Sequence, residues 1–518
     1  MRLLTSFFAF LCIFIFPVIG HATSAKPSQT SDFVFSERVD AMMEPIAQIS
    51  SSFVFYEITL FGVNVPLIVL WLVAGALFFT VYLGFINVRY FKYAVSLLFA
   101  TSTHDNAASE DGEISRIQAL STSLSGTVGL GNIAGVAVAI SAGGPGAMVW
   151  MIIMGLFGMS TKFVECSMAV RYRHRTKTGH YSGGPMYYLK EGFSERGFPK
   201  LGWVFGAFFS VCCILGTMGA GNMFQVNQAY QQVLNVTGGE TSFLADRGWI
   251  FGIFIAFLVG AVIIGGIKSI AKVASRIVPF MAILYFIGAI GVLVMNYQNI
   301  PGAIVTIFES AFNFSAIGGG FLGALIQGVR RAAFSNEAGI GTASIAHASV
   351  KTDSHVSQGF VAMLEPFIDT VVICTITALV IVVSGVYTAG ADVEGVALTS
   401  RAFGDSISFF PYILSAAVFL FAFSTMIAWS YYGLKSTTYI FGENIVVEGV
   451  YKIMYCLMVI VGASADMENI IGFMDSAIFA MAVPNIIGLY VMAPMLKRDI
   501  KAYLTENNLI HSRKKGKG

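Results

Sequence analysis

Two glycine-rich clusters lie in the middle of long apolar stretches and contain the residues best suited to bind a ligand. The first contains Thr127, Gly129, Gly131 and Asn132, and the second is the segment 334–342. Glycine inside a helix costs about 1 kcal/mol relative to alanine, and polar groups at membrane depth need partners, so such clusters are tolerated where a helix opens onto a cavity. An opened helix presents N–H groups to an anion and carbonyls to a cation. Alternatively, the small residues only allow helices to pack closely.

Hydroxyl and amide side chains occur in two further apolar stretches. Ser424 and Thr425 are adjacent, and hydroxyl oxygens suit a sodium ion, although such groups also bond their own helix backbone. Gln225 belongs to the amide-rich segment 219–228. That segment either lines a polar cavity or forms hydrogen bonds between helices.

Two carboxylates, Glu337 and Asp369, also fall inside apolar stretches. Intramembrane carboxylates are functional candidates, and the alternative is that they pair with Arg330 or Arg331. The sequence shows neither a nucleophile paired with a base nor clustered metal ligands, which argues against an enzyme. The segment 129–134 matches part of a dinucleotide-binding fingerprint, but that motif also needs a preceding strand and a later acidic residue, and neither is present.

The composition places the chain in a membrane. Its 518 residues are 56% hydrophobic and 12% charged, against about 25% charged residues in soluble domains. The net charge of +2 is too small to indicate a nucleic-acid-binding protein. The apolar stretches run for about 20 residues instead of alternating over about 10. We therefore predict an all-α polytopic membrane protein, with the lipid bilayer as its surroundings.

Eleven apolar stretches are long enough to be membrane-spanning helices. They lie at 66–87, 117–141, 147–171, 201–233, 248–267, 277–297, 316–347, 360–387, 409–433, 446–464 and 470–496. Fourteen basic residues lie at or soon after the ends of odd-numbered spans. Those residues are Arg89, Lys92, Arg171, Arg173, Arg175, Lys177, Lys268, Lys272, Arg276, Lys351, Lys435, Lys497, Arg498 and Lys501. Cytoplasmic loops are rich in lysine and arginine, so this pattern predicts a cytoplasmic C-terminus and a first span that starts outside.

The N-terminus has the pattern of a secretory signal peptide. Arg2 precedes the apolar run 3–16, and small residues lead to a cleavage position after Ala22. The alternative is an uncleaved first helix. We expect a signal peptide at 1–22, an extracytoplasmic segment at 23–65, a transmembrane domain at 66–496 and a basic cytoplasmic tail at 497–518. The predicted location is a bacterial-type plasma (inner) membrane.

The two glycine-rich clusters lie in the second and seventh spans, which cross the membrane in opposite directions. Groups of five helices that begin at these spans would therefore be inverted repeats, at about 117–297 and 316–496. Inverted repeats with discontinuous helices are the pattern expected of a secondary transporter.

A set of short motifs makes the chain resemble the alanine or glycine:cation symporter family, which includes sodium:alanine symporters. The motifs are Gly129-Leu-Gly-Asn-Ile-Ala-Gly, Gly143-Gly-Pro-Gly146, Ser182-Gly-Gly-Pro-Met-Tyr187, Gly265-Gly-Ile-Lys-Ser-Ile270, Ser335-Asn-Glu-Ala-Gly339 and Trp429-Ser-Tyr-Tyr-Gly433. The resemblance covers roughly residues 60–500. It implies a leucine-transporter-like fold, in which one extra N-terminal helix precedes a five-plus-five inverted repeat. It also implies uptake of small neutral amino acids, chiefly alanine and glycine, with Na⁺ as the coupling ion and no cofactor.

The resemblance also implies two sets of site residues. The substrate set is Thr127, Gly129, Gly131, Asn132, Gln225, Phe334, Ser335, Asn336, Gly339 and Trp429. The sodium set consists of the carbonyls of Ser125 and Val128 with the hydroxyls of Ser424 and Thr425. Backbone N–H groups of the opened spans would bind the substrate carboxylate, Asn336 and Gln225 its polar groups, and Trp429 and Phe334 would close an apolar wall.

The expected mechanism is alternating access, in which sodium and substrate together favour an occluded state. A ligand shifts a conformational equilibrium only if it binds the two states unequally. Two alternatives remain within transport. Proton coupling through Asp369 or Glu337 is the nearer one. An ion channel is the other, although the sequence has no evident repeated filter or regular series of arginines.

Overall fold

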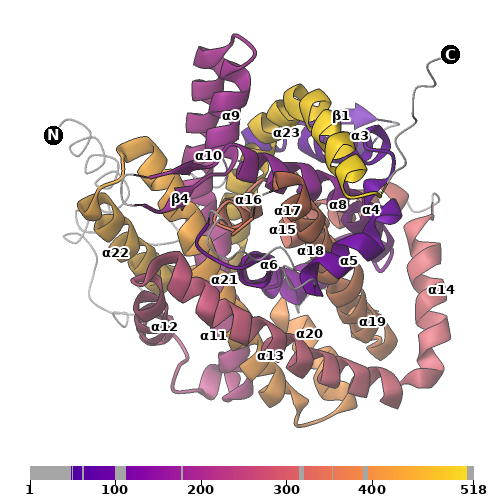
Figure 1. Cartoon of the computed structure of the whole chain (residues 1–518). Coiled ribbons are helices and arrows are strands. Elements are labelled where there is room, and N and C mark those ends of the chain that lie inside the picture. The colour runs from indigo at the N-terminus through magenta and orange to yellow at the C-terminus, as the bar shows by residue number, and fades with distance from the viewer. Residues whose placement is uncertain are drawn as a thin grey trace.

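The computed structural model describes residues 48, 51–60, 63–99, 112–176, 179–313, 320–352, 354–388 and 395–509. This described part is helical apart from two small antiparallel hairpins, β1 with β2 and β3 with β4 (Figure 1). The predicted signal peptide, most of the segment 23–65 and the end of the predicted tail lie outside the described residues.

The strands are short, and the helices range from one turn to 40 residues. The strands are β1 (Glu57–Leu60), β2 (Val63–Pro66), β3 (His174–Arg175) and β4 (Tyr181–Ser182). The α-helices in the first half are α3 (Leu67–Tyr82), α4 (Ile86–Arg89), α5 (Phe91–Phe99), α6 (Arg116–Thr127), α7 (Ala134–Gly143), α8 (Ala147–Arg171), α9 (Pro185–Ser194), α10 (Pro199–Met218), α11 (Phe224–Val236), α12 (Gly248–Ile263) and α13 (Gly266–Met295). Those in the second half are α14 (Ile300–Ala311), α15 (Phe321–Asn336), α16 (Ala343–His347), α17 (His355–Ala362), α18 (Leu364–Pro366), α19 (Thr375–Ser384), α20 (Val396–Ser406), α21 (Phe410–Phe441), α22 (Ile445–Gly462) and α23 (Met467–Glu506). The 3-10 helices are η1 (Leu130–Asn132), η3 (Gly239–Thr241), η4 (Tyr297–Asn299) and η6 (Val386–Thr388), and the π-helices are η2 (Gly219–Met223) and η5 (Phe367–Cys374).

The apolar helices confirm an integral membrane protein. Among the described residues, seven helical runs are long and apolar enough to cross a membrane, and eight if α6 and α7 form one bent span. Helices α3 and α12 are apolar but have only 16 residues each, whereas a straight span needs about 20. Every predicted stretch overlaps helical structure, but the count of eleven spans remains a prediction.

The second predicted span is interrupted, as the sequence predicts. Helix α6 begins with a capping box in which Ser115 and Gln118 each accept a hydrogen bond from the other residue's N–H. It ends at Thr127, and the backbone at Gly129 is extended. The chain then resumes through η1 into α7, and the two halves are bent by 55°. We call the segment 127–132 the first break.

The seventh predicted span is interrupted by a different backbone conformation. Between the end of α15 and the start of α16, Glu337, Gly339 and Gly341 have φ angles of 56°, 91° and 96°. Glycine adopts this left-handed region at no steric cost, but a residue with a side chain rarely does. A right-handed helix cannot continue through three such residues. We call the segment 337–342 the second break.

Helix α8 lies directly behind the second break. A Cβ atom added at Gly158 would lie 2.9 Å from the Cβ of Ala338, and one at Gly155 would lie 3.1 Å from the Cβ of Thr370. These two glycines therefore allow α8 to approach the break and η5 at close range. The buried face of α8 thus determines where both segments lie.

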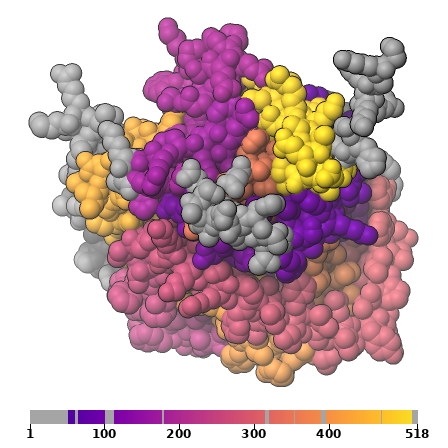
Figure 2. All heavy atoms as spheres, in the orientation of Figure 1, coloured from indigo at the N-terminus to yellow at the C-terminus, as the bar shows by residue number. Residues whose placement is uncertain are grey.

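Several segments predicted to be cytoplasmic meet on one side of the bundle. Asp499 near the end of α23 pairs with Arg171 at 2.5 Å and with His355 at 3.1 Å. The Glu113 carboxylate lies 2.8 Å from the ring of His180. Figures 1 and 2 show α9 and the end of α23 projecting on this same side. The segments share a side as predicted, and its assignment to the cytoplasm remains a prediction.

Candidate functional site

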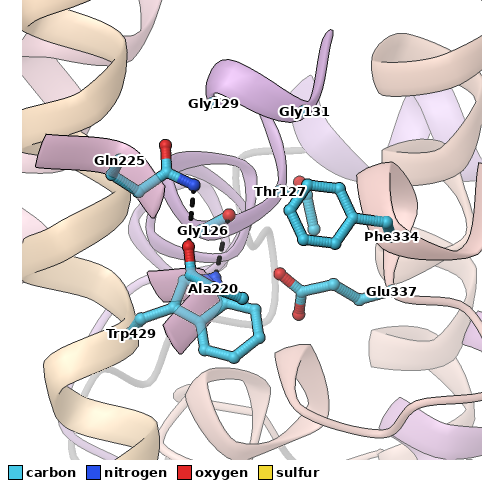
Figure 3. A pocket seen from close by; sticks show the side chains of 9 residues that line it. All are labelled: Gly126, Thr127, Gly129, Gly131, Ala220, Gln225, Phe334, Glu337 and Trp429. Carbon is cyan, nitrogen blue, oxygen red and sulfur yellow. Dashed lines mark hydrogen bonds between the residues drawn. The ribbon is translucent and has the colours of Figure 1, made fainter. Parts of the chain in front are cut away.

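Both breaks face one small cavity in the interior of the bundle (Figure 3). Its lining residues come from the two breaks and the helix ends before them (α6 and α15), from η2 and α11, and from α21. They are Gly126, Thr127, Gly129, Gly131, Ala220, Gln225, Phe334, Glu337 and Trp429. The cavity volume is about 10 Å³, close to the lower limit for holding one water. Side chains around the cavity must therefore move before a larger molecule can bind.

The first break diverts backbone N–H groups from the helix to side chains. In an unbroken helix the Gly129 N–H would bond the carbonyl four residues earlier, but it donates to Asn132 Oδ1 at 2.9 Å. The next N–H, of Leu130, donates to Gln225 Oε1 at 3.3 Å. Both acceptors are neutral amide oxygens, and the second bond is long. The first break therefore presents donors that an anionic group could take over.

Asp369 connects the first break to α15. Its Oδ1 accepts a hydrogen bond from Asn132 Nδ2 at 2.6 Å, and its Oδ2 accepts bonds from the hydroxyls of Ser335 at 2.6 Å and Thr370 at 2.7 Å. Thr370 in turn accepts a bond from Asn336 Nδ2 at 2.9 Å. Hydrogen bonds to a charged acceptor are stronger than neutral ones. A single carboxylate in the π-helix η5 thus fixes side chains next to both breaks.

Two glutamates surround the second break. Glu165 Oε1 on α8 accepts bonds from the Gly339 N–H at 2.9 Å and from Asn485 Nδ2 at 2.7 Å. Glu337 accepts a hydrogen bond from the Thr342 hydroxyl, and in Figure 3 its carboxylate points into the cavity. Both glutamates are at most 1% exposed. The second break therefore presents negative charge where the first presents donors.

The alternative that Glu337 or Asp369 pairs with the neighbouring arginines is wrong. Arg330 lies 3.0 Å from Asp475 Oδ2, and Arg331 also pairs with that oxygen. Asp475 belongs to α23, so these arginines join α15 to that helix. In the described part of the chain, neither Glu337 nor Asp369 has an ion pair with an arginine.

Two aromatic side chains close the cavity. Trp429 on α21 donates a hydrogen bond from Nε1 to the Gly126 carbonyl at 3.1 Å. The Cβ atom of Trp429 packs against Gly221, where an added Cβ would lie 2.3 Å from it. Phe334 lies beside Gly131 and packs edge-on against Phe224, with ring centroids 5.5 Å apart. The glycines thus leave room for the aromatic walls.

The residues predicted to bind sodium meet at the first break, but not all point the same way. Thr425 Oγ1 is buried and has no hydrogen-bond partner among the described residues, and it would lie 2.3 Å from a Cβ added at Gly129. The Ser125 hydroxyl donates to the Ser424 carbonyl at 2.7 Å. The Ser424 hydroxyl donates to the Phe421 carbonyl of its own helix at 3.0 Å. Of the two predicted hydroxyl ligands, only Thr425 is therefore without a partner.

Further charged groups are buried beside the site. Lys162 on α8 lies 3.5 Å from Glu365, which also contacts His347. All three side chains are fully buried. With Glu165, Glu337 and Asp369, this described region contains four carboxylates, one lysine and one histidine, so a cation that enters it would meet several carboxylates. Lys162, Glu165 and Glu365 were not among the residues predicted from the sequence, although charged residues within apolar spans are a detectable signal.

Six of the ten predicted substrate residues line the cavity. They are Thr127, Gly129, Gly131, Gln225, Phe334 and Trp429. Asn132, Ser335 and Asn336 instead form the hydrogen-bonded layer with Asp369 and Thr370, and Gly339 bonds Glu165. Gly126, Ala220 and Glu337 line the cavity without having been predicted as substrate residues. The sequence marked Glu337 as an intramembrane carboxylate and as a candidate for proton coupling.

Comparison with known sequences identifies one family. The chain matches the model of the sodium:alanine symporter family over residues 48–516. It is 40% identical over 441 residues to the sodium/alanine symporter AgcS of Methanococcus maripaludis, which covers 85% of this chain and 94% of AgcS. It is 32% identical over 449 residues to the amino-acid carrier protein AlsT of Bacillus subtilis, which covers 85% and 91% of the two chains.

Comparison with solved structures identifies the fold. The structure of MhsT in complex with L-phenylalanine matches with a TM-score of 0.55 and 15% identity, and the match covers 74% of this chain and 90% of MhsT. At this identity the likeness concerns the fold alone. It confirms the leucine-transporter-like part of the predicted fold class.

Proposed function

Because the chain belongs to the sodium:alanine symporter family, we propose that it couples sodium entry to uptake of small neutral amino acids, chiefly alanine and glycine. The family and its relatives are transporters rather than enzymes. The observation that supports the proposal most directly is the small cavity at which two broken helices meet. Discontinuous helices that meet at mid-membrane are where secondary transporters bind substrates and ions.

The first break would bind the substrate carboxylate. The Leu130 N–H is held by Gln225 through a long 3.3 Å bond to a neutral oxygen, so a charged carboxylate can replace that oxygen at little cost. Gln225 would then turn its amide to the substrate. Asn132, Ser335 and Asn336 would hold the two breaks in place from behind. Trp429 and Phe334 would limit the side chain to hydrogen or a methyl group.

The sodium ion would bind on the other side of the first break. We assign to it the carbonyls of Ser125 and Val128 and the hydroxyls of Ser424 and Thr425. The break supports this assignment because the Gly129 N–H no longer bonds the Ser125 carbonyl. Thr425 contributes a buried oxygen without a hydrogen-bond partner among the described residues. Sodium and substrate would thus stabilise the same backbone segment from its two sides.

Alternating access follows from this shared segment. Each ligand stabilises the ordered first break, so the occluded state is favoured most when both are bound. The closed cavity leaves no room for an amino acid until Gln225, Phe334 or Trp429 moves, so substrate binding must itself change the positions of these side chains. Movement toward either side of the membrane would release both ligands together.

Buried carboxylates support proton coupling as the competing function. Glu337 caps the C-terminal end of α15, Asp369 bonds Ser335 in the last turn of that helix, and both carboxylates are at most 1% exposed. A carboxylate that takes up and releases a proton could replace the sodium ion as the coupling group. The two coupling modes make different predictions for the same transport measurement.

The test is uptake of radiolabelled alanine into proteoliposomes with an imposed gradient. We expect accumulation with an inward sodium gradient and none with a proton gradient alone. Glycine should compete, whereas phenylalanine should not. Accumulation driven only by protons would reject sodium coupling, and single-channel currents across a bilayer would reject the symporter in favour of a channel.

We further propose the topology that the sequence predicts. The signal peptide would be 1–22, the segment 23–65 extracytoplasmic, the repeats 117–297 and 316–496, and the tail 497–518 cytoplasmic in a bacterial inner membrane. The contacts of Asp499 with Arg171 and His355 support a common side for these segments. A single cysteine introduced at Lys501 should not react with a membrane-impermeant thiol reagent in intact cells. Labelling at that position would show that the true topology is the opposite of the proposed one.

A further inference from the structure

Glu337 is a buried carboxylate on the wall of the cavity, and its position is unusual. It lies at the C-terminal cap of α15 with φ 56°, a conformation that glycine or asparagine adopts more easily than glutamate. Its side chain is 1% exposed. In Figure 3 the carboxylate points toward the space between Phe334 and Trp429. Backbone geometry therefore does not explain why a glutamate occupies this position.

Lys162 acts electrostatically on Glu337, but Glu165 and Glu365 share it. Lys162 pairs with Glu365 at 3.5 Å, and both arginines at the end of α15 pair with Asp475. Among the described residues, the Glu337 carboxylate accepts a hydrogen bond from the neutral hydroxyl of Thr342. A buried carboxylate that shares one lysine with two others, and has no ion pair of its own among the described residues, is costly. A cation that enters the cavity would offset this cost.

The opposite wall of the cavity has the complementary character. There the first break presents the Gly129 and Leu130 N–H groups, which are held by neutral amide oxygens. One wall thus favours an anionic group and the other a cationic group. An amino acid carries both groups on adjacent atoms. A sodium ion in this cavity would interact only with the wall that contains the carboxylate.

We propose that the Glu337 carboxylate binds the α-ammonium group of the substrate, and so restricts transport to molecules that carry a free amino group beside a carboxylate. The inference deepens the proposed function and rests on it. Glu337 is a binding residue for the ammonium group in this scheme, and Thr342 orients its carboxylate. Monocarboxylates of the same size would leave Glu337 buried and unpaired, and the site would reject them.

The test compares alanine with propionate, which lacks the amino group, as competitors of labelled alanine uptake. In Glu337→Gln, which keeps the shape and removes the charge, the KM for alanine should rise about 10- to 100-fold, as expected for loss of a bond to a charged group. Inhibition by propionate should be unchanged or stronger. The preference for alanine over propionate, measured as the ratio of their inhibition constants, should therefore fall sharply. The sodium dependence of uptake should stay the same.

Glu165→Gln is the matched control, because Glu165 is equally buried and contacts the same break but does not line the cavity. It should lower uptake without changing the preference for alanine over propionate. If the preference changes equally in both variants, Glu337 acts through the fold and the inference is overturned. A change in sodium dependence with an unaltered KM for alanine would make Glu337 an ion ligand and would also overturn it.

Two further measurements keep the inference testable if Glu337→Gln does not fold or if the proposed function is wrong. If Glu337→Gln does not fold, Glu337→Asp keeps the charge one methylene further back, and it should raise the KM for alanine while still excluding propionate. An unchanged KM in that variant would reject the inference. If the wild-type protein fails to transport alanine under any gradient, the proposed function is wrong, and that result is separate from the comparison of variants.

Discussion

The two breaks interrupt their helices by different means, and they present different groups to the cavity: hydrogen-bond donors at the first and a carboxylate at the second. The first break has Gly129 in an extended conformation and its N–H groups diverted to Asn132 and Gln225. The second break uses left-handed residues and is surrounded by carboxylates, Glu337 and Glu165. A symmetric pair of breaks would bind two like groups. This pair instead suits a zwitterion, whose two charges differ in sign.

The glycines of the two breaks are needed for different reasons. At Gly129 the requirement is space, because an added Cβ would lie 2.3 Å from Thr425 Oγ1. At Gly339 and Gly341 the requirement is backbone conformation, because φ is positive at both. Substitutions at these glycines can therefore distinguish a need for space from a need for a left-handed backbone.

The largest effect is expected for Gly129→Ala. The added methyl group would overlap Thr425 and push α21 away from the first break, at a cost of up to about 3 kcal/mol, which corresponds to roughly 150-fold. Uptake and sodium affinity should fall together, measured in proteoliposomes. Combining it with Thr425→Ala should restore part of both. No rescue by the double variant would show that space at Thr425 is not the limiting factor.

Asp369→Asn should have the next largest effect. It removes the charge that Asn132, Ser335 and Thr370 bond, at a cost of about 2 kcal/mol, or roughly 30-fold in the KM for alanine. Cys374→Ala is the control, because Cys374 contacts Asn132 and Ser335 without carrying charge. Equal effects from the two variants would argue against a special role for the charge that connects the breaks.

Gly339→Ala should be intermediate. A side chain in the left-handed region costs roughly 1–2 kcal/mol, or about 10-fold, and here the added methyl would lie 3.0 Å from Leu72. Gly339→Asn should be better tolerated than alanine if conformation dominates. Uptake rates of the two variants decide this, and a worse result for asparagine would show that space dominates at the second break too.

Thr425→Val should have a smaller effect, confined to sodium. It removes the unpartnered hydroxyl and keeps the shape, and the sodium concentration for half-maximal uptake should rise about 5-fold, as for loss of one hydrogen-bond-like contact. Ser424→Ala should change it less, because the Ser424 hydroxyl bonds its own helix. If the variant that combines Ser424→Ala with Thr425→Val has an unchanged sodium dependence of uptake, the assigned ion site is rejected.

The smallest effects are expected for the amides. Gln225→Ala should raise the KM for alanine about 3-fold, the loss of one neutral hydrogen bond, because Gln225 lines the cavity. Asn336→Ala should also reduce uptake, but through the layer with Thr370 and the Ala338 N–H. Normal transport by both variants, with normal amounts of folded protein, would remove them from the site.

Much of the architecture follows from local sequence. Apolar stretches of about 20 residues, and glycine with polar residues at 129–132 and 335–342, predict helices and their interruptions because each depends on neighbouring residues alone. The alternative that Glu337 pairs with an arginine is wrong because it considered only neighbours in the sequence. Arg330 and Arg331 are close to Glu337 in sequence, but their partner, Asp475, comes from α23.

The sequence by itself determined that this chain is a membrane-embedded helical transporter with two opened helices, since hydropathy and the cost of intramembrane glycine and polar groups are local properties. Only the tertiary structure decided which polar groups face the cavity. Asn132 and Ser335 turn to Asp369, whereas Glu337 enters the cavity. The physical reason is that a buried polar group takes the partner that packing brings within about 3 Å, and that partner lies on another helix.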